Sequence, residues 1–183
     1  MKEDNRKKLI DTLPKKSIGA EIGVHKGDFS ADLLNALDPQ ELHLIDPWHY
    51  QDSDTYKNSW YGGLSKGQIE MDERYSSVNE KFKKEIEKLT VTIHRKTSTE
   101  ALSGFPDNYF DWIYIDGNHL FDYVMCDLKL AYSKVKEKGF ICGDDYEEGG
   151  WWEGGVLRAV DDFCLKINLD KKIFGNQFIV QKI

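Results

Sequence analysis

Three aspartates and a histidine are the residues of this sequence whose types and spacing could do chemistry. Asp116 directly follows the short apolar run at 113–115. Asp144 and Asp145 come just after a second apolar run, and an amphipathic segment at helical spacing separates the two runs. Two strands joined by a helix are expected to be parallel neighbours with a right-handed crossover. The three carboxylates should therefore meet at one edge of the sheet, where open α/β sheets bind ligands.

Carboxylates that lie within a few ångströms of one another raise each other's pKa values, so such a cluster is costly without a cation. Hard oxygen ligands suit Mg²⁺ or Mn²⁺ better than zinc, and Asp116, Asp144 and Asp145 are therefore expected to bind a divalent metal ion. His119 could serve as a general base, because its ordinary pKa of about 6.5 suits proton transfer near neutral pH. The alternative is that these aspartates cap helices or face solvent, and that His119 is a capping or hydrogen-bonded loop residue.

A glycine-rich turn follows the first expected strand at 17–24. Glu21 precedes Gly23 by two residues, and Val24 is the first of the residues between Gly23 and Gly27. Glycines let the backbone approach a ligand closely, and the helix beyond the turn directs its N–H groups at that ligand. The spacing departs from the GxGxxG pattern of dinucleotide folds, which weighs against an NAD-dependent oxidoreductase.

Asp46 ends the second expected strand, at 42–45. At this place in an open α/β fold, an acid accepts hydrogen bonds from both ribose hydroxyls of a nucleoside cofactor. The glycine turn and this acid together therefore predict an adenosine-binding site.

Strand-like and helix-like segments alternate along the whole chain, which predicts an α/β fold. We expect a Rossmann-like, mostly parallel seven-stranded sheet with helices on both faces and a C-terminal antiparallel hairpin. The hairpin should pair 172–174 with 178–180, and the helix of the acidic stretch should end at Lys138-Gly139. Further helices are expected at 2–13, 72–88 and 99–103, and a third strand at 91–95.

The segment at 48–70 has neither helical nor strand periodicity and carries five aromatic residues. A connection of this length in a compact domain is usually functional or disordered, and disordered segments are poor in aromatics. We therefore expect a lid over the ligand-binding edge; a surface excursion with two partly buried rings is the alternative. Trp151 and Trp152, in a second irregular loop, could stack on a ring-bearing substrate or be half-buried residues of the rim.

Length and composition are those of one ordinary globular domain over 1–183. The net charge of −7 and the pI near 5.3 argue against a nucleic-acid-binding surface, and no apolar run is long enough to span a membrane. The basic run that begins at Arg6 is interleaved with acids and is expected to be a solvated helix face. Cys126, Cys142 and Cys164 are expected to be reduced core cysteines of a cytoplasmic protein.

Over nearly its whole length the chain resembles the class I S-adenosylmethionine-dependent methyltransferases. The stretch GAEIGVHKG is similar to the first motif of that family, and LHLIDPW is similar to the second. The stretches IDGNHLFDYVMCDL and GFICGDDY resemble the small-molecule subgroup related to macrocin O-methyltransferase and the cephalosporin hydroxylase-like proteins. The macrocin-type enzymes have a longer N-terminal region, so the resemblance does not imply a particular substrate.

This resemblance implies S-adenosylmethionine as the cofactor and gives each matching residue a role. The cofactor contacts would come from Glu21 and Gly23 for the methionine part, Asp46 for the ribose and Ser98 for the adenine region, with Val24, Gly27 and Asp116 lining the same site. The resemblance also implies that the three clustered aspartates hold the metal ion. His119 falls where family members place a catalytic base, three residues beyond the first metal ligand.

The sequence supports three functional hypotheses. The first is a metal-assisted O-methyltransferase that acts on a small hydroxylated molecule, a sugar being one candidate. The second is a methyltransferase without metal, in which His119 alone activates an oxygen or nitrogen acceptor. The third is a non-catalytic S-adenosylmethionine-binding module; the intact acids argue against it, since a lost site has no reason to retain a costly carboxylate cluster. Self-association of the chain stays open.

Overall fold

Strands and helices alternate along the chain in the computed structural model, which describes residues 2–183. The strands are β1 (Ile18–Ile22), β2 (Glu41–Ile45), β3 (Val91–His94), β4 (Phe110–Ile115), β5 (Val135–Gly143), β6 (Lys171–Phe174) and β7 (Gln177–Gln181). The helices are α1 (Lys2–Ile10), α2 (Asp28–Leu37), α3 (Gln68–Lys81), α4 (Lys83–Glu87), α5 (Ser98–Leu102), α6 (Phe121–Lys134) and α7 (Gly155–Ile167), with a short 3₁₀ helix η1 (Asp54–Tyr56).

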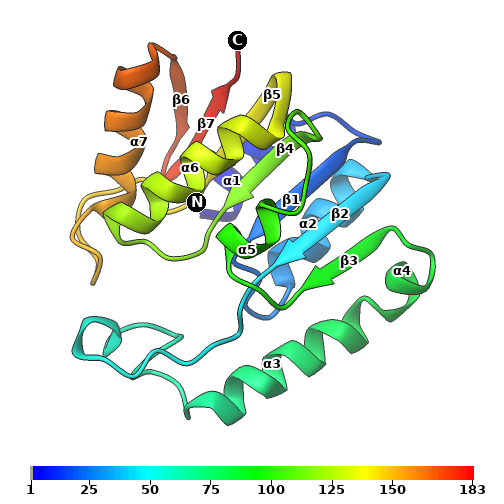
Figure 1. The fold of residues 1–183 in the computed structure, drawn as a ribbon, viewed down its shortest axis with the longest axis vertical. Coiled ribbons are helices and arrows are strands. Elements are labelled where there is room, and N and C mark those ends of the chain that lie inside the picture. The colour runs from blue at the N-terminus through cyan, green and yellow to red at the C-terminus, as the bar shows by residue number, and fades with distance from the viewer. Residues whose placement is uncertain (1) are drawn as a thin grey trace.

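The strands form one sheet in the order β3-β2-β1-β4-β5-β7-β6 (Figure 1). Strands β1 to β5 run parallel, whereas β7 is antiparallel to β5 and β6 is antiparallel to β7. This topology confirms the expected α/β fold and its C-terminal hairpin. The strand order reverses between β1 and β4, and ligands of open α/β sheets bind outside the carboxyl ends of the strands at such a switch point.

Helices cover both faces of the sheet (Figure 1), and a hydrophobic core lies on each face. One core includes Leu128 of α6 and Phe163 of α7. The other includes Leu9 of α1 and Leu33 of α2, both fully buried. Strand β4 takes part in both cores, because successive strand residues point to opposite faces.

The long helix of the acidic stretch ends earlier than the sequence predicts. It was expected to reach Lys138-Gly139, but α6 ends at Lys134 and Val135 already belongs to β5. Val135 is fully buried and pairs with Phe110 of β4. The pairing of a buried β-branched residue therefore outweighs the local preference for helix.

Two other expectations need correction. The helix expected at 72–88 begins at Gln68, and Phe82 separates α3 from α4. Cys142 and Cys164 are buried as predicted, but Cys126 is exposed, so the expectation of three core cysteines is wrong. Cys126 lies on the outer face of α6, between two pairs of inward-facing neighbours.

The irregular segment before α3 contains only turns and η1. Its path leaves the end of β2 and passes outside the sheet before α3 begins (Figure 1). Trp48, at its start, is fully buried and donates an indole hydrogen bond to the carbonyl of His25 (2.9 Å). Among the described residues, no helix combines the length and apolarity required to cross a membrane.

Candidate functional site

A cavity of about 300 Å³ lies at the carboxyl ends of β1, β2 and β4. Gly23 reaches it from the turn between β1 and α2, and Asp46 from the end of β2. Ser98, the first residue of α5, and Asp116, which follows β4, complete this set. Parallel strands bring together four residues that the sequence predicted as cofactor contacts.

Among the described residues, Asp46 is the acid of the cavity whose side chain accepts the most hydrogen bonds. Its side chain is almost fully buried, and Oδ2 accepts hydrogen bonds from the backbone N–H groups of Val24 (2.9 Å) and His25 (3.1 Å). Oδ1 accepts a hydrogen bond from the backbone of Trp48 (2.7 Å), and the Tyr61 hydroxyl donates to Oδ2. Burial raises the pKa of Asp46, while these hydrogen bonds act in the opposite direction.

Gly23 occupies a position that no other residue could take without displacement of the backbone. Its φ is +90°, and an added Cβ would lie 1.9 Å from the carbonyl oxygen of Asp116. The glycine therefore lets β1 and β4 lie close together where both reach the cavity. Gly27 serves packing and not the cavity. A Cβ added at Gly27 would lie 2.8 Å from the ring of Phe82, so the glycine lets the start of α2 pack closely against the end of α3.

Three predicted cofactor contacts do not line the cavity: Glu21, Val24 and Gly27. Glu21 is buried and accepts a hydrogen bond from the Ser30 hydroxyl. Its burial raises the pKa of the carboxyl group to about 8. The turn at Gly23 therefore meets the cavity through Gly23 itself, and Val24 contributes its backbone N–H to Asp46.

Asp127 is a residue of the cavity that the sequence analysis missed. It lies on α6, is buried, and accepts a hydrogen bond from the hydroxyl of Ser98. Burial raises its pKa to about 6. Its position three residues after Val124 and one before Leu128 places it on the inward face of the helix, which was the signal available in the sequence.

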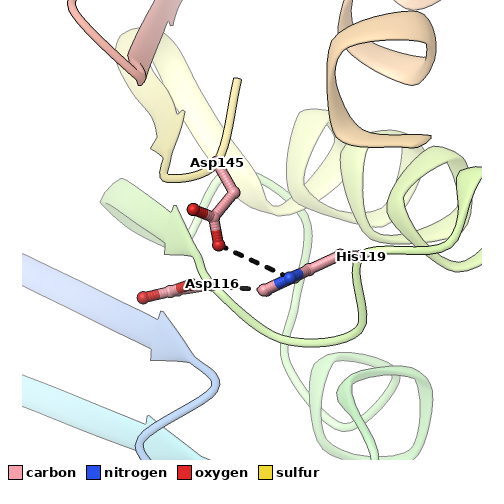
Figure 2. Close-up of side chains that lie close together, drawn as sticks. All are labelled: Asp116, His119 and Asp145. Carbon is pink, nitrogen blue, oxygen red and sulfur yellow. Dashed lines mark ion pairs between the residues drawn. The ribbon is translucent and has the colours of Figure 1, made fainter. Parts of the chain in front are cut away.

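His119 faces two of the clustered carboxylates, those of Asp116 and Asp145 (Figure 2). Its Nε2 is 3.5 Å from Oδ1 of Asp116, and its Nδ1 is 3.4 Å from Oδ2 of Asp145. One ligand atom from each of the three residues lies within 4.8 Å of the others. Burial lowers the pKa of His119, but the hydrogen bond and charge of Asp116 and the charge of Asp145 outweigh it and raise the pKa above its usual value.

Arg6 joins this cluster from α1, which corrects the expectation of a solvated helix face for this residue, whereas Lys7 and Lys8 of the same run are exposed as predicted. Its Nη2 lies 3.1 Å from Oδ2 of Asp116 and also donates to Oδ2 of Asp144. Arg6 precedes Leu9 by three residues and Ile10 by four, so the apolar positions of the same helix predict that it faces inward. The interleaved charges at 2–8 concealed that signal.

The predicted three-carboxylate metal site does not fit beside Arg6. Asp144 is almost fully buried, and its Oδ1 accepts hydrogen bonds from Asn176 (2.6 Å), Gln177 and the backbone of Asp145 (2.7 Å). Its Oδ2 is bound to Arg6. Binding of Mg²⁺ or Mn²⁺ by all three aspartates remains a prediction that would need this guanidinium to leave.

Aromatic side chains form the outer side of the site. The ring of Trp151 lines the cavity, stacks at 6.1 Å and 23° on His119, and lies 5.3 Å from the ring of Tyr56. Trp152 meets the same histidine edge-on at 4.9 Å. Residues of the irregular segment, Tyr56 and Tyr61 among them, line the cavity as well, so this segment forms part of the cavity wall.

Comparisons with known proteins agree with this architecture. A solved O-methyltransferase from Bacillus cereus, in complex with S-adenosylhomocysteine, is 11% identical with a TM-score of 0.62, covering 98% of this chain and 78% of that one. The O-methyltransferase NovP is 16% identical with a TM-score of 0.62 and the same two coverages. These likenesses show the fold.

Comparison of sequences gives the family of the chain, whereas the structural likenesses give only its fold. An uncharacterized protein of Acanthamoeba polyphaga mimivirus is 33% identical over 82 residues; the match spans 43% of this chain and only 37% of the viral protein. The model of a family described as a methyltransferase domain matches residues 20–146, more than half of the chain. The match includes the glycine turn, Asp46, His119 and the three clustered aspartates. Arg6 lies outside the matched residues. The chain therefore belongs to this methyltransferase-domain family.

Proposed function

We propose that this protein transfers the methyl group of S-adenosylmethionine to a hydroxyl group of a small molecule. The observation that carries the proposal is a single cavity that joins Gly23, Asp46 and Ser98 to Asp116, beside His119. Family membership supports methyl transfer, and the two O-methyltransferases of similar fold support an oxygen acceptor. The cofactor would supply a methyl group on a positively charged sulfur.

The residues of this chain would bind the cofactor and prepare the acceptor. Asp46 would accept hydrogen bonds from the ribose, and Ser98 with Asp127 would face the adenine. An acceptor hydroxyl must lose its proton and be held about 3 Å from the methyl group. In the described part of the chain, Nδ1 of His119 has no hydrogen-bond partner, so this nitrogen could take the proton. Asp145, 3.4 Å away, would stabilise the resulting charge.

The aromatic rim favours an acceptor with a flat or ring-shaped body. Trp151 and Tyr56 line the cavity, and Trp60 is 62% exposed, with its ring 6.3 Å from that of His25, another lining residue. Rings of this kind bind sugars and phenols through their apolar faces. The acceptor is therefore proposed to be a small hydroxylated ring compound, a sugar being one candidate.

The presence of Arg6 favours the metal-free version of this reaction over the metal-assisted one. The metal-assisted version would place Mg²⁺ or Mn²⁺ on Asp116, Asp144 and Asp145, where it would lower the pKa of the acceptor hydroxyl. The metal-free version relies on His119 as the base. The two versions differ in one respect that is simple to measure, because only the first loses turnover in the presence of a chelator.

Isothermal titration of S-adenosylhomocysteine into the purified protein tests the proposal. We expect micromolar binding that persists in EDTA. Asp46→Asn should strongly weaken the binding of S-adenosylhomocysteine. The amide nitrogen of Asn donates hydrogen bonds, so it cannot accept them from the backbone N–H groups or from a ribose hydroxyl as the carboxylate oxygen does. Asp54→Asn, an exposed acid of the irregular segment, is the matched control and should bind like wild type. No binding by wild type, with or without Mg²⁺, would overturn the proposal.

A further inference from the structure

Arg6 lies at the point on which the carboxylates of Asp116 and Asp144 converge. Its Nη2 is 3.1 Å from Oδ2 of Asp116 and also donates to Oδ2 of Asp144. Asp116 follows β4 and Asp144 follows β5, so one nitrogen of α1 links the ends of two neighbouring strands. A divalent ion shared by both aspartates would need the same position, because its oxygen ligands must lie within about 2.0–2.6 Å.

The packing of α1 holds Arg6 in this place. Leu9 and Ile10 lie three and four residues after Arg6, so the three side chains share one face of the helix. Leu9 is fully buried and Ile10 nearly so. The guanidinium also stacks over the ring of Phe29 in α2, with Cζ 4.6 Å from the ring centroid. Contacts with the core and with α2 thus fix the direction of the side chain.

The two oxygens of Asp144 have separate tasks. Oδ1 accepts hydrogen bonds from the side chains of Asn176 and Gln177 and from the backbone N–H of Asp145. These donors orient the carboxylate as outer-shell hydrogen bonds orient metal ligands. Oδ2 is bound to Arg6.

We propose that Arg6 is a built-in cation of the acid cluster and stands where the metal-assisted hypothesis places a divalent ion. The guanidinium neutralises part of the carboxylate charge and joins Asp116 to Asp144, two tasks that an ion would otherwise perform. A second cation at the same oxygens would meet a fixed positive charge at contact distance, so Arg6 and a metal ion exclude each other. The inference rests on the proposed function and deepens it by giving it a metal-free centre.

Manganese binding tests this assignment without knowledge of the methyl acceptor. Mn²⁺ is titrated into the full chain and followed by the EPR signal of the free ion, for wild type, Arg6→Gln and Lys7→Gln. Lys7 is an exposed neighbour on the same helix, so Lys7→Gln controls for the change in net charge. We expect Arg6→Gln to bind Mn²⁺ at least tenfold more tightly than wild type, and Lys7→Gln to match wild type. Stoichiometric Mn²⁺ binding by wild type that Arg6→Gln does not improve would overturn the proposal.

Two further variants keep the test decisive. Asp144→Asn, added to Arg6→Gln, should remove the gained affinity, because an uncharged amide replaces the carboxylate. Should Arg6→Gln not fold, as judged by circular dichroism, Arg6→Met takes its place. It should also bind Mn²⁺ more tightly than wild type, because its apolar side chain can still pack along the helix but carries no positive charge; unchanged affinity would count against the proposal.

S-adenosylhomocysteine binding on the same samples reports the proposed function separately. If wild type binds this ligand, the Mn²⁺ titrations alone decide the role of Arg6. If wild type does not bind it, the methyltransferase proposal fails, whatever the Mn²⁺ result.

Discussion

The hydroxyl of Tyr61 donates a hydrogen bond to Oδ2 of Asp46, the acid proposed to hold the ribose of the cofactor. The irregular segment that carries Tyr61 therefore uses an acceptor atom that a ribose hydroxyl would need. Tyr61 must yield this atom, or share it, when a nucleoside binds. Cofactor binding and the position of the segment are expected to be coupled through this one carboxylate.

Tyr61→Phe is expected to tighten the binding of S-adenosylhomocysteine several-fold. The substitution removes the competing hydroxyl, and a difference of about 1 kcal/mol corresponds to roughly a fivefold change in Kd. Isothermal titration measures it. Tyr50→Phe, on the same segment, is the control, because the Tyr50 hydroxyl makes no hydrogen bond among the described residues. Weaker binding by Tyr61→Phe would mean that Tyr61 stays in contact with Asp46 in the bound state.

His119→Gln is expected to lower methyl transfer by about a hundredfold or more while S-adenosylhomocysteine binding stays within a factor of about two. His119 contacts the acid cluster and does not line the cofactor cavity, which separates the two effects. The carboxylates of Asp116 and Asp145 raise the pKa of His119 above its ordinary value, so the rate of wild type should rise toward the alkaline side as the imidazole loses its proton. Full turnover by His119→Gln on an identified acceptor would exclude His119 as the base.

Asp127→Asn is expected to raise the free energy of unfolding at pH 8 and to change it little at pH 4. Burial raises the pKa of folded Asp127 to about 6, from an ordinary value near 3.8. Between these values the folded state binds more protons, so wild-type stability falls as pH rises from about 4 to 6 and stays lower above it. The penalty is up to about 3 kcal/mol, a figure that already includes the opposing effect of the hydrogen bond from Ser98.

Urea unfolding of wild type and Asp127→Asn at both pH values measures this difference. Asp122→Asn, an exposed acid on the same helix, should leave the pH dependence of wild type unchanged. A variant that is less stable than wild type at pH 8 would show that ionised Asp127 has stabilising partners that outweigh its burial.

Local patterns in the sequence were sufficient for the fold. Alternating apolar runs and amphipathic segments predict parallel strands joined by helices, and Gly175-Asn176 between two short runs predicts the hairpin of β6 and β7. Such patterns did not predict the boundary between α6 and β5. Val135 joins the strand because it pairs with Phe110, a contact that exists only once the sheet has formed.

The sequence by itself determined which acids meet, because strand order and strand ends follow from patterns a few residues long. Asp116, Asp144 and Asp145 converge because β4 and β5 are parallel neighbours. The charge balance of that cluster was decided by tertiary structure alone. Arg6 is more than a hundred residues away in the chain, and only the packing of α1 against α2 and the sheet brings its guanidinium to the carboxylates. Long-range ion pairs depend on side-chain positions in space, and spacing along a sequence does not encode those positions.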